Sequence, residues 1–376
     1  MQKNSFLIKP ISIRGKNLNT YKIFLKTNEI TQYTDSKDKT ILSKKRLEGI
    51  SFARACCCLG IVIFHYFCHS RGNFKLLFKT ANSSFGFIFV TAFFNISGAC
   101  LYYNYPIVKS KIIFYFKRWK SIFPPYYLCY LYFYIELTIR FHGLLFKKNL
   151  SKIYFTILGL DGYLLYKIKT CYLIGEWFLG AIIIIFFIYP FIAFIYSKNY
   201  YISFLMICIL NISMYYKQFF IIDRNRNIIT CITSFYFGMT TIKFKKYFFA
   251  NNNSFLISLI IFIVLSTVKI YSSIIIYQMQ GFSLFIILTK IGKYLTQKKY
   301  ERIFIKISNL SYSIYLLHHR IIIDILSVNN PFKWYSHILV LSLILLLILI
   351  YSKIHSIVVD SFIKSNFFQN IESLFI

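Results

Sequence analysis

The stretch RLEGISFARACCCLGIVIFH (residues 46–65) joins a polar segment to the first of many apolar runs. Residues 1–49 are rich in lysine, whereas from Ile50 onward long apolar runs alternate with short polar breaks. A helix needs about 20 residues to cross the hydrocarbon core of a bilayer, and many of these runs have that length. The pattern therefore predicts an all-α, polytopic bundle of transmembrane helices.

About ten runs are long enough to be spans. Because two of them are short and two others are almost continuous, the number of spans lies between roughly eight and eleven. We predict three segments: a cytoplasmic lysine-rich segment 1–49, a membrane domain 50–360 and a short cytoplasmic tail 361–376. The predicted spans are 50–70, 85–105, 122–141, 175–196, 200–216, 228–243, 254–271, 273–292, 307–327 and 335–359.

The composition is both very apolar and very basic, which few classes of protein combine. The 376 residues are 57% hydrophobic and only 15% charged, yet the formal net charge is +32. Soluble domains are about 25% charged, and disordered chains lack this much apolar mass. A nucleic-acid binder or a membrane protein with basic loops remains. The basic residues flank the apolar runs, so we expect a bilayer and no nucleic acid as partner.

The distribution of Lys and Arg also predicts an orientation. With the N-terminus inside, about two-thirds of the basic residues fall on the cytoplasmic side, as the positive-inside rule requires. Both termini are therefore expected in the cytoplasm, and the protein in the inner cell membrane. Arg54 and Arg320 lie within predicted spans.

Arg54 and His65 form the most informative pair in the first span. Eleven helical steps bring them to within about 20° of one face and about 16 Å apart along the axis. Histidine can take and return a proton near neutral pH, and arginine recognises phosphate or carboxylate. We interpret the pair as a polar seam that faces the bundle interior. A snorkelling Arg54 with a hydrogen-bonded interior His65 would fit the same spacing.

Five elements, in order, resemble the acyltransferase-3 family of integral membrane acyltransferases. Two departures are visible. Ser121 stands where the family usually has a second Arg, and Glu176 precedes the Trp of its element, so Glu176 receives no catalytic role. The elements are Arg–ten residues–His in 46–65, FFNISG (93–98), FYFKRWKSIFPPYY (114–127), EWFLGAIIIIFFIYP (176–190) and LSYSIYLLHH (310–319).

The resemblance implies transfer of an acyl group, usually acetyl, from a cytoplasmic acyl-CoA to a hydroxyl of a surface glycan or its lipid-linked precursor. It implies that His65 is catalytic and that Arg54 is its partner. His65 would act as a general base or accept the acyl group itself, and the sequence leaves both open. The substrate-binding residues that the family-like elements suggest are Arg118, Ser97, Lys117, Trp177 and His318.

We expect no bound cofactor, with acetyl-CoA or another acyl-CoA as co-substrate. No metal site is predicted, because the nine cysteines show no C-x-x-C spacing. The competing functional class is a transporter or flippase of a glycan-related substrate, with Arg54 and His65 along its pathway. Internal repeats and spans broken by Gly or Pro, which are typical of transporters, are not evident.

Overall fold

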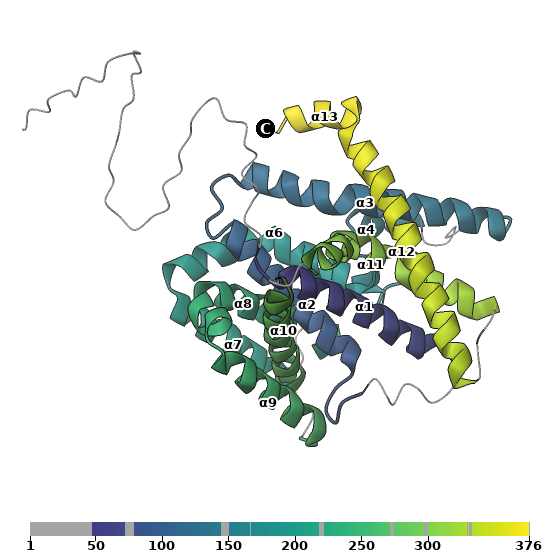
Figure 1. Ribbon diagram of the computed structural model, residues 1–376. Coiled ribbons are helices and arrows are strands. Elements are labelled where there is room, and N and C mark those ends of the chain that lie inside the picture. The colour runs from purple at the N-terminus through teal and green to yellow at the C-terminus, as the bar shows by residue number, and fades with distance from the viewer. Residues whose placement is uncertain are drawn as a thin grey trace, which may run out of the picture. The chain divides into compact units, whose positions relative to one another are not determined.

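The computed structural model is built from helices (Figure 1). It describes residues 47–71, 79–143, 150–165, 167–217, 222–270, 274–296, 300–328, 330 and 333–375, so residues 1–46 of the predicted N-terminal segment lie outside the described part. Within that part there is no β-strand, and one isolated bridge joins Lys79 to Ser84. The predicted all-α fold is confirmed.

A helix of at least 15 residues lies at each of the ten predicted spans. These helices are α1 (Ile50–His69), α2 (Phe85–Asn104), α3 (Lys111–Arg140), α6 (Trp177–Lys198), α7 (Tyr200–Tyr216), α8 (Ile228–Lys243), α9 (Asn253–Thr267), α10 (Ile274–Thr296), α11 (Glu301–Val328) and α12 (Trp334–Lys364). The short helices are η2 (Leu150–Lys152), α4 (Ile153–Ile157), α5 (Asp161–Leu164), η3 (Arg224–Arg226), η4 (Lys246–Ala250) and α13 (Asn366–Ser373).

Five of the helices, α1, α2, α6, α10 and α12, are long and apolar enough to cross a membrane. Helices α7 and α9 are apolar but shorter. The outward face of α12 carries large exposed apolar side chains such as Leu339 and Leu346, which suit contact with lipid. The chain is therefore a helical membrane bundle, while the number of spans and their orientation stay predictions.

Helix α3 differs from its predicted span, which began at residue 122. The helix begins at Lys111, where the Ser110 hydroxyl accepts a hydrogen bond from the backbone N–H of Ile113 at 3.4 Å. The prediction began the span where the charges end, but backbone geometry tolerates Lys and Arg in a helix. Consequently Lys117, Arg118 and Lys120, which precede the predicted third span in the sequence, lie in the first part of α3.

The predicted C-terminal tail, residues 361–376, is also helical in its described part. Helix α12 continues to Lys364, and α13 follows it. Phe368 of α13 is buried and stacks on Trp119 of α3, with 5.8 Å between ring centroids. Lys120 of α3 lies 2.6 Å from the Glu372 carboxylate. These contacts join the end of the chain to α3.

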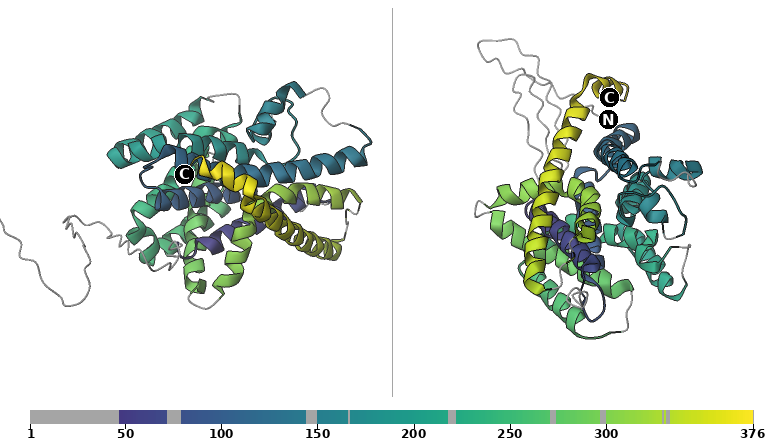
Figure 2. Two further views of the ribbon diagram at one scale, coloured as in Figure 1. Left: turned by 90° about the horizontal axis from the view of Figure 1, so that it is seen from above. Right: turned by 90° about the vertical axis from the view of Figure 1, so that its right-hand side faces the viewer.

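Helix α1 lies among α2, α10, α11 and α12, which pack against it (Figure 1). Helices α11 and α12 run side by side, and α12 also crosses α3 (Figure 2). At the crossing, the Nε2 atom of His355 lies 3.0 Å from the carbonyl oxygen of Pro125 and donates to it. The first span is thus surrounded by helices from both halves of the chain.

Helices α2 and α8 pack backbone against backbone through two glycines. A Cβ atom on Gly98 would collide with the carbonyl oxygen of Phe235, and one on Gly238 would collide with the carbonyl oxygen of Asn95. Small residues at helix interfaces allow this close approach, and packing is the main force between helices in lipid. Packing of α2 against α8 therefore requires glycine at position 98, whatever the role of the neighbouring Ser97.

We expect Gly98→Ala to lower the free energy of unfolding by about 1–3 kcal/mol, because the added methyl group forces α2 and α8 apart. The measurement is the thermal unfolding midpoint of the purified protein in detergent. Gly143→Ala is the matched control, since within the described residues a Cβ there comes no closer than an ordinary 3.8 Å, to the carbonyl oxygen of Phe141. Equal midpoints for the two variants would contradict the packing argument.

Candidate functional site

A cavity of about 310 Å³ lies between α1, α2, α3, α6 and α11. The first three are consecutive in the sequence, whereas α6 and α11 follow much later, so tertiary packing creates the cavity. Five of the seven residues predicted for the site line it, and most of the remaining lining is apolar or aromatic. The five are Arg54, His65, Ser97, Trp177 and His318.

Arg54 contributes the positive charge of the cavity. Its Nη2 atom donates to the Sγ atom of Cys100 on α2 at 3.3 Å. Among the described residues, none of the ion pairs involves Arg54. Because α1 rises about 1.5 Å per residue, the cavity extends about 16 Å along α1 from Arg54 to His65. A guanidinium without a carboxylate partner is well suited to bind an anion.

His65 meets two histidines of α11 at the other end of the cavity. Its ring centroid lies 5.2 Å from that of His318 and 5.1 Å from that of His319. No hydrogen bond joins His65 to another residue of the described ranges. The imidazole is therefore available to a molecule in the cavity.

Backbone contacts determine the tautomer of His318. Its Nδ1 atom lies 2.8 Å from the carbonyl oxygen of Tyr315 and 3.1 Å from that of Ile314. A carbonyl oxygen only accepts, so Nδ1 carries the proton of the neutral ring and Nε2 keeps a lone pair. This Nε2 atom is buried and has no hydrogen-bond partner in the described part of the chain. His318 can thus accept a hydrogen bond from a ligand hydroxyl.

Sequence reasoning missed the polar group around Glu176. The Nδ1 atom of His319 lies 2.7 Å from Oε1 of Glu176, and its Nε2 atom lies 2.9 Å from Nε2 of His69. Glu176 lines the cavity beside Trp177. The signal that could have found the group is the spacing of His65 and His69, which lie one helical turn apart on one face.

Tyr315 of α11 positions Glu176 and the start of α6. Gly175, at φ 76°, makes the turn that precedes the helix. The Tyr315 hydroxyl donates to the carbonyl oxygen of Glu176 at 2.7 Å and accepts from the N–H of Leu179 at 3.0 Å. These two bonds attach the first turn of α6 to α11 and so bring Glu176 and Trp177 to the cavity.

Arg118 and Lys117 are not among the residues that line the cavity. The Arg118 guanidinium lies over the rings of Tyr105 and Phe186, at 5.7 and 5.8 Å from their centroids. Phe186 itself lines the cavity, so Arg118 is one residue removed from it. Lys117 is exposed on α3. Neither placement tests their predicted role in substrate binding.

Residues 47–357 match the family model described as an acyltransferase domain. No curated protein and no solved structure matches the chain. The matched range contains every residue that lines the cavity, from Arg54 to His318.

We expect Tyr315→Phe to lower the free energy of unfolding by about 1–2 kcal/mol, because two hydrogen bonds to the start of α6 are lost. The check is the thermal unfolding midpoint in detergent. Tyr201→Phe is the matched control, since the exposed Tyr201 hydroxyl makes no bond within the described ranges. If both variants unfold at the wild-type midpoint, Tyr315 does not hold α6 in place.

Proposed function

The chain belongs to the acyltransferase-3 family, and we propose that it moves an acyl group, acetyl in the simplest case, from a cytoplasmic acyl-CoA to a hydroxyl of a cell-surface carbohydrate or its lipid-linked precursor. The inner cell membrane is the proposed location. One observation carries the proposal: a single cavity combines an arginine that has no acidic partner among the described residues with two histidines about 5 Å apart, ring centroid to ring centroid.

In the proposed reaction, the acceptor hydroxyl oxygen attacks the thioester carbonyl carbon of the donor. A C–O bond forms, the C–S bond breaks, and His65 takes the hydroxyl proton as a general base. The departing CoA thiolate then takes that proton from His65, so the imidazole returns to its neutral form. The lone pair on Nε2 of His318 accepts a hydrogen bond from a neighbouring hydroxyl of the acceptor. Two neighbouring imidazoles that can each accept from a hydroxyl suit a molecule with adjacent hydroxyl groups, as a sugar has, and this supports a carbohydrate acceptor.

The donor is proposed to enter at the Arg54 end. CoA carries phosphate groups, and arginine binds phosphate through strong charge-assisted hydrogen bonds. Arg54 donates a hydrogen bond to Cys100 of α2, and Arg118 lies outside the cavity over the ring of Phe186, which lines it. A cavity of 310 Å³ is at the lower end of small-molecule sites, which span about 300–1,000 Å³. We therefore expect it to hold the reacting ends of both substrates, with the nucleotide of CoA outside.

We expect His65→Ala to lower the rate of acyl transfer by about 10²–10⁴-fold, the usual contribution of a general base. The assay incubates purified protein with labelled acetyl-CoA and an oligosaccharide acceptor and measures covalent label on the glycan. His142→Asn is the matched control, because His142 lies in an exposed turn after α3 and asparagine tolerates its positive φ.

Two results would contradict this function. Full activity of His65→Ala, in protein that inserts and elutes as the wild type does, would exclude His65 as the base. Uptake of the substrate into vesicles without label on the glycan would instead support a transporter. Label on the protein itself, formed without acceptor and absent from His65→Ala, would show that His65 accepts the acyl group.

We expect Arg54→Gln to raise the KM for acyl-CoA by about 10–100-fold, the range for losing a hydrogen bond to a charged group. The KM for the acceptor should change little, because the acceptor is proposed to bind at the His65 end. Arg71→Gln is the matched control, because Arg71 is exposed and lies two residues beyond the C-terminal end of α1. It should leave both constants unchanged. A wild-type donor KM in Arg54→Gln would remove Arg54 from donor binding.

A further inference from the structure

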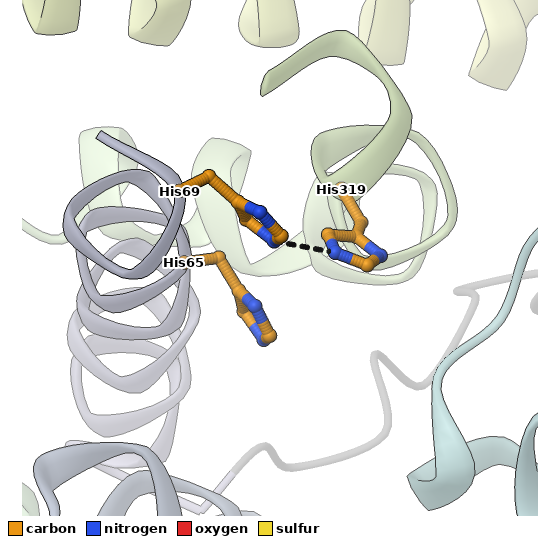
Figure 3. A group of neighbouring side chains, drawn as sticks. All are labelled: His65, His69 and His319. Carbon is orange, nitrogen blue, oxygen red and sulfur yellow. Dashed lines mark hydrogen bonds between the residues drawn. The ribbon is translucent and has the colours of Figure 1, made fainter. Parts of the chain in front are cut away.

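Three histidines converge at the C-terminal end of α1 (Figure 3). His65 and His69 come from α1 and His319 from α11, and one ring nitrogen from each lies within 4.8 Å of the others. All three rings lie in the space between the two helices, with the Nε2 atoms of His69 and His319 2.9 Å apart. We propose that these three residues bind a Zn²⁺ ion.

The helical spacing of the first two ligands suits a metal. His65 and His69 are four residues apart, so both side chains lie on one face of α1, one turn apart. The same i, i+4 pair of histidines holds zinc in the H-E-x-x-H motif of metalloproteases. A third histidine from a second helix completes a set of three imidazoles, which is a known ligand set of zinc sites with an open fourth position.

Glu176 supplies the second feature of a zinc site. Its Oε1 atom lies 2.7 Å from Nδ1 of His319. As placed, Oε1 makes no hydrogen bond within the described residues, but a small rotation of the imidazole lets it accept the proton on that nitrogen. The lone pair of the neutral ring then resides on Nε2, the atom that faces His69. Metal-bound histidines are commonly oriented by a carboxylate in this way, which also makes the imidazole a stronger ligand. The carboxylate thus prepares His319 for a metal ion.

The distances require only small adjustments. Zinc–nitrogen bonds of about 2.0–2.1 Å in a tetrahedral arrangement place ligand nitrogens about 3.4 Å apart. The three nitrogens lie within 4.8 Å of one another, and the Nε2 atoms of His69 and His319 are only 2.9 Å apart. Rotation of the exposed His69 ring and the partly exposed His319 ring can bring all three to the required spacing. Imidazole ligands favour zinc and its neighbours over magnesium or calcium, which take oxygen ligands. No metal site was predicted from the sequence, because that prediction rested on cysteine spacing alone.

A bound Zn²⁺ would occupy the lone pair that the proposed reaction assigns to His65. Zinc at this site should therefore inhibit acyl transfer reversibly, and this consequence rests on the proposed function. The binding of zinc itself does not rest on it.

The test measures zinc content and affinity of the full-length protein, purified in detergent and first stripped with a chelator. We expect one Zn²⁺ per chain, and an affinity at least tenfold lower in His69→Gln and in His319→Gln. Glu176→Gln should weaken binding by about 10–100-fold, as changes to such carboxylates do. His142→Asn is the matched control and should bind zinc as the wild type does.

X-ray absorption of the zinc-loaded wild type identifies the ligands without any variant, so a folding defect cannot obscure the result. Nitrogen neighbours at about 2.0–2.1 Å with imidazole scattering support the proposal, whereas sulfur neighbours at about 2.3 Å overturn it. The proposal is also overturned if the wild type shows no saturable binding of one Zn²⁺ per chain. It is likewise overturned if His69→Gln and His319→Gln both bind zinc with the wild-type affinity.

Zinc titration in the acyl-transfer assay separates this proposal from the function. We expect inhibition of the wild type and weaker inhibition of His69→Gln, which keeps His65. If zinc binds through the three histidines but does not inhibit, the role of His65 in the reaction fails and the metal site stands.

Discussion

The structure depends on one constraint: the polar face of α1 cannot point into lipid. A charged group at the centre of a bilayer costs several kcal/mol even on the lenient insertion scale, about 2.5–3.5 kcal/mol for Arg. Arg54 and His65 share a face of α1, and packing by α2, α10, α11 and α12 turns that face inward. The shielded face becomes one wall of the cavity, so the requirement that organises the bundle also creates its site.

The opposite wall is assembled by α11 and the start of α6. Tyr315 attaches the first turn of α6, which brings Glu176 and Trp177 beside the histidines. His318 and His319 are adjacent in the chain, yet α11 gives them different partners. His318 bonds to the backbone and faces the cavity, whereas His319 lies between Glu176 and His69. One pair of residues thus serves both the cavity and the cluster beside it.

The sequence predicted the helices well because hydrophobic length is a local property. A helix lies at each predicted span, and the shared face of Arg54 and His65 follows from helical periodicity alone. The start of α3 was wrong by eleven residues, since charge does not prevent a helix from forming. The structure places Ser97, Trp177 and His318 in the cavity wall with Arg54 and His65, but places Lys117 and Arg118 outside it.

The sequence by itself determined which segments are helical and apolar and which family the elements of residues 46–319 resemble. It also aligned Arg54 with His65 on one helix. Only the tertiary structure decided what faces that pair. Two contacts join residues that lie far apart in the chain: Glu176 with His319, and His69 with His319. Such contacts depend on how helices pack against one another, and helical periodicity within a single segment carries no information about that.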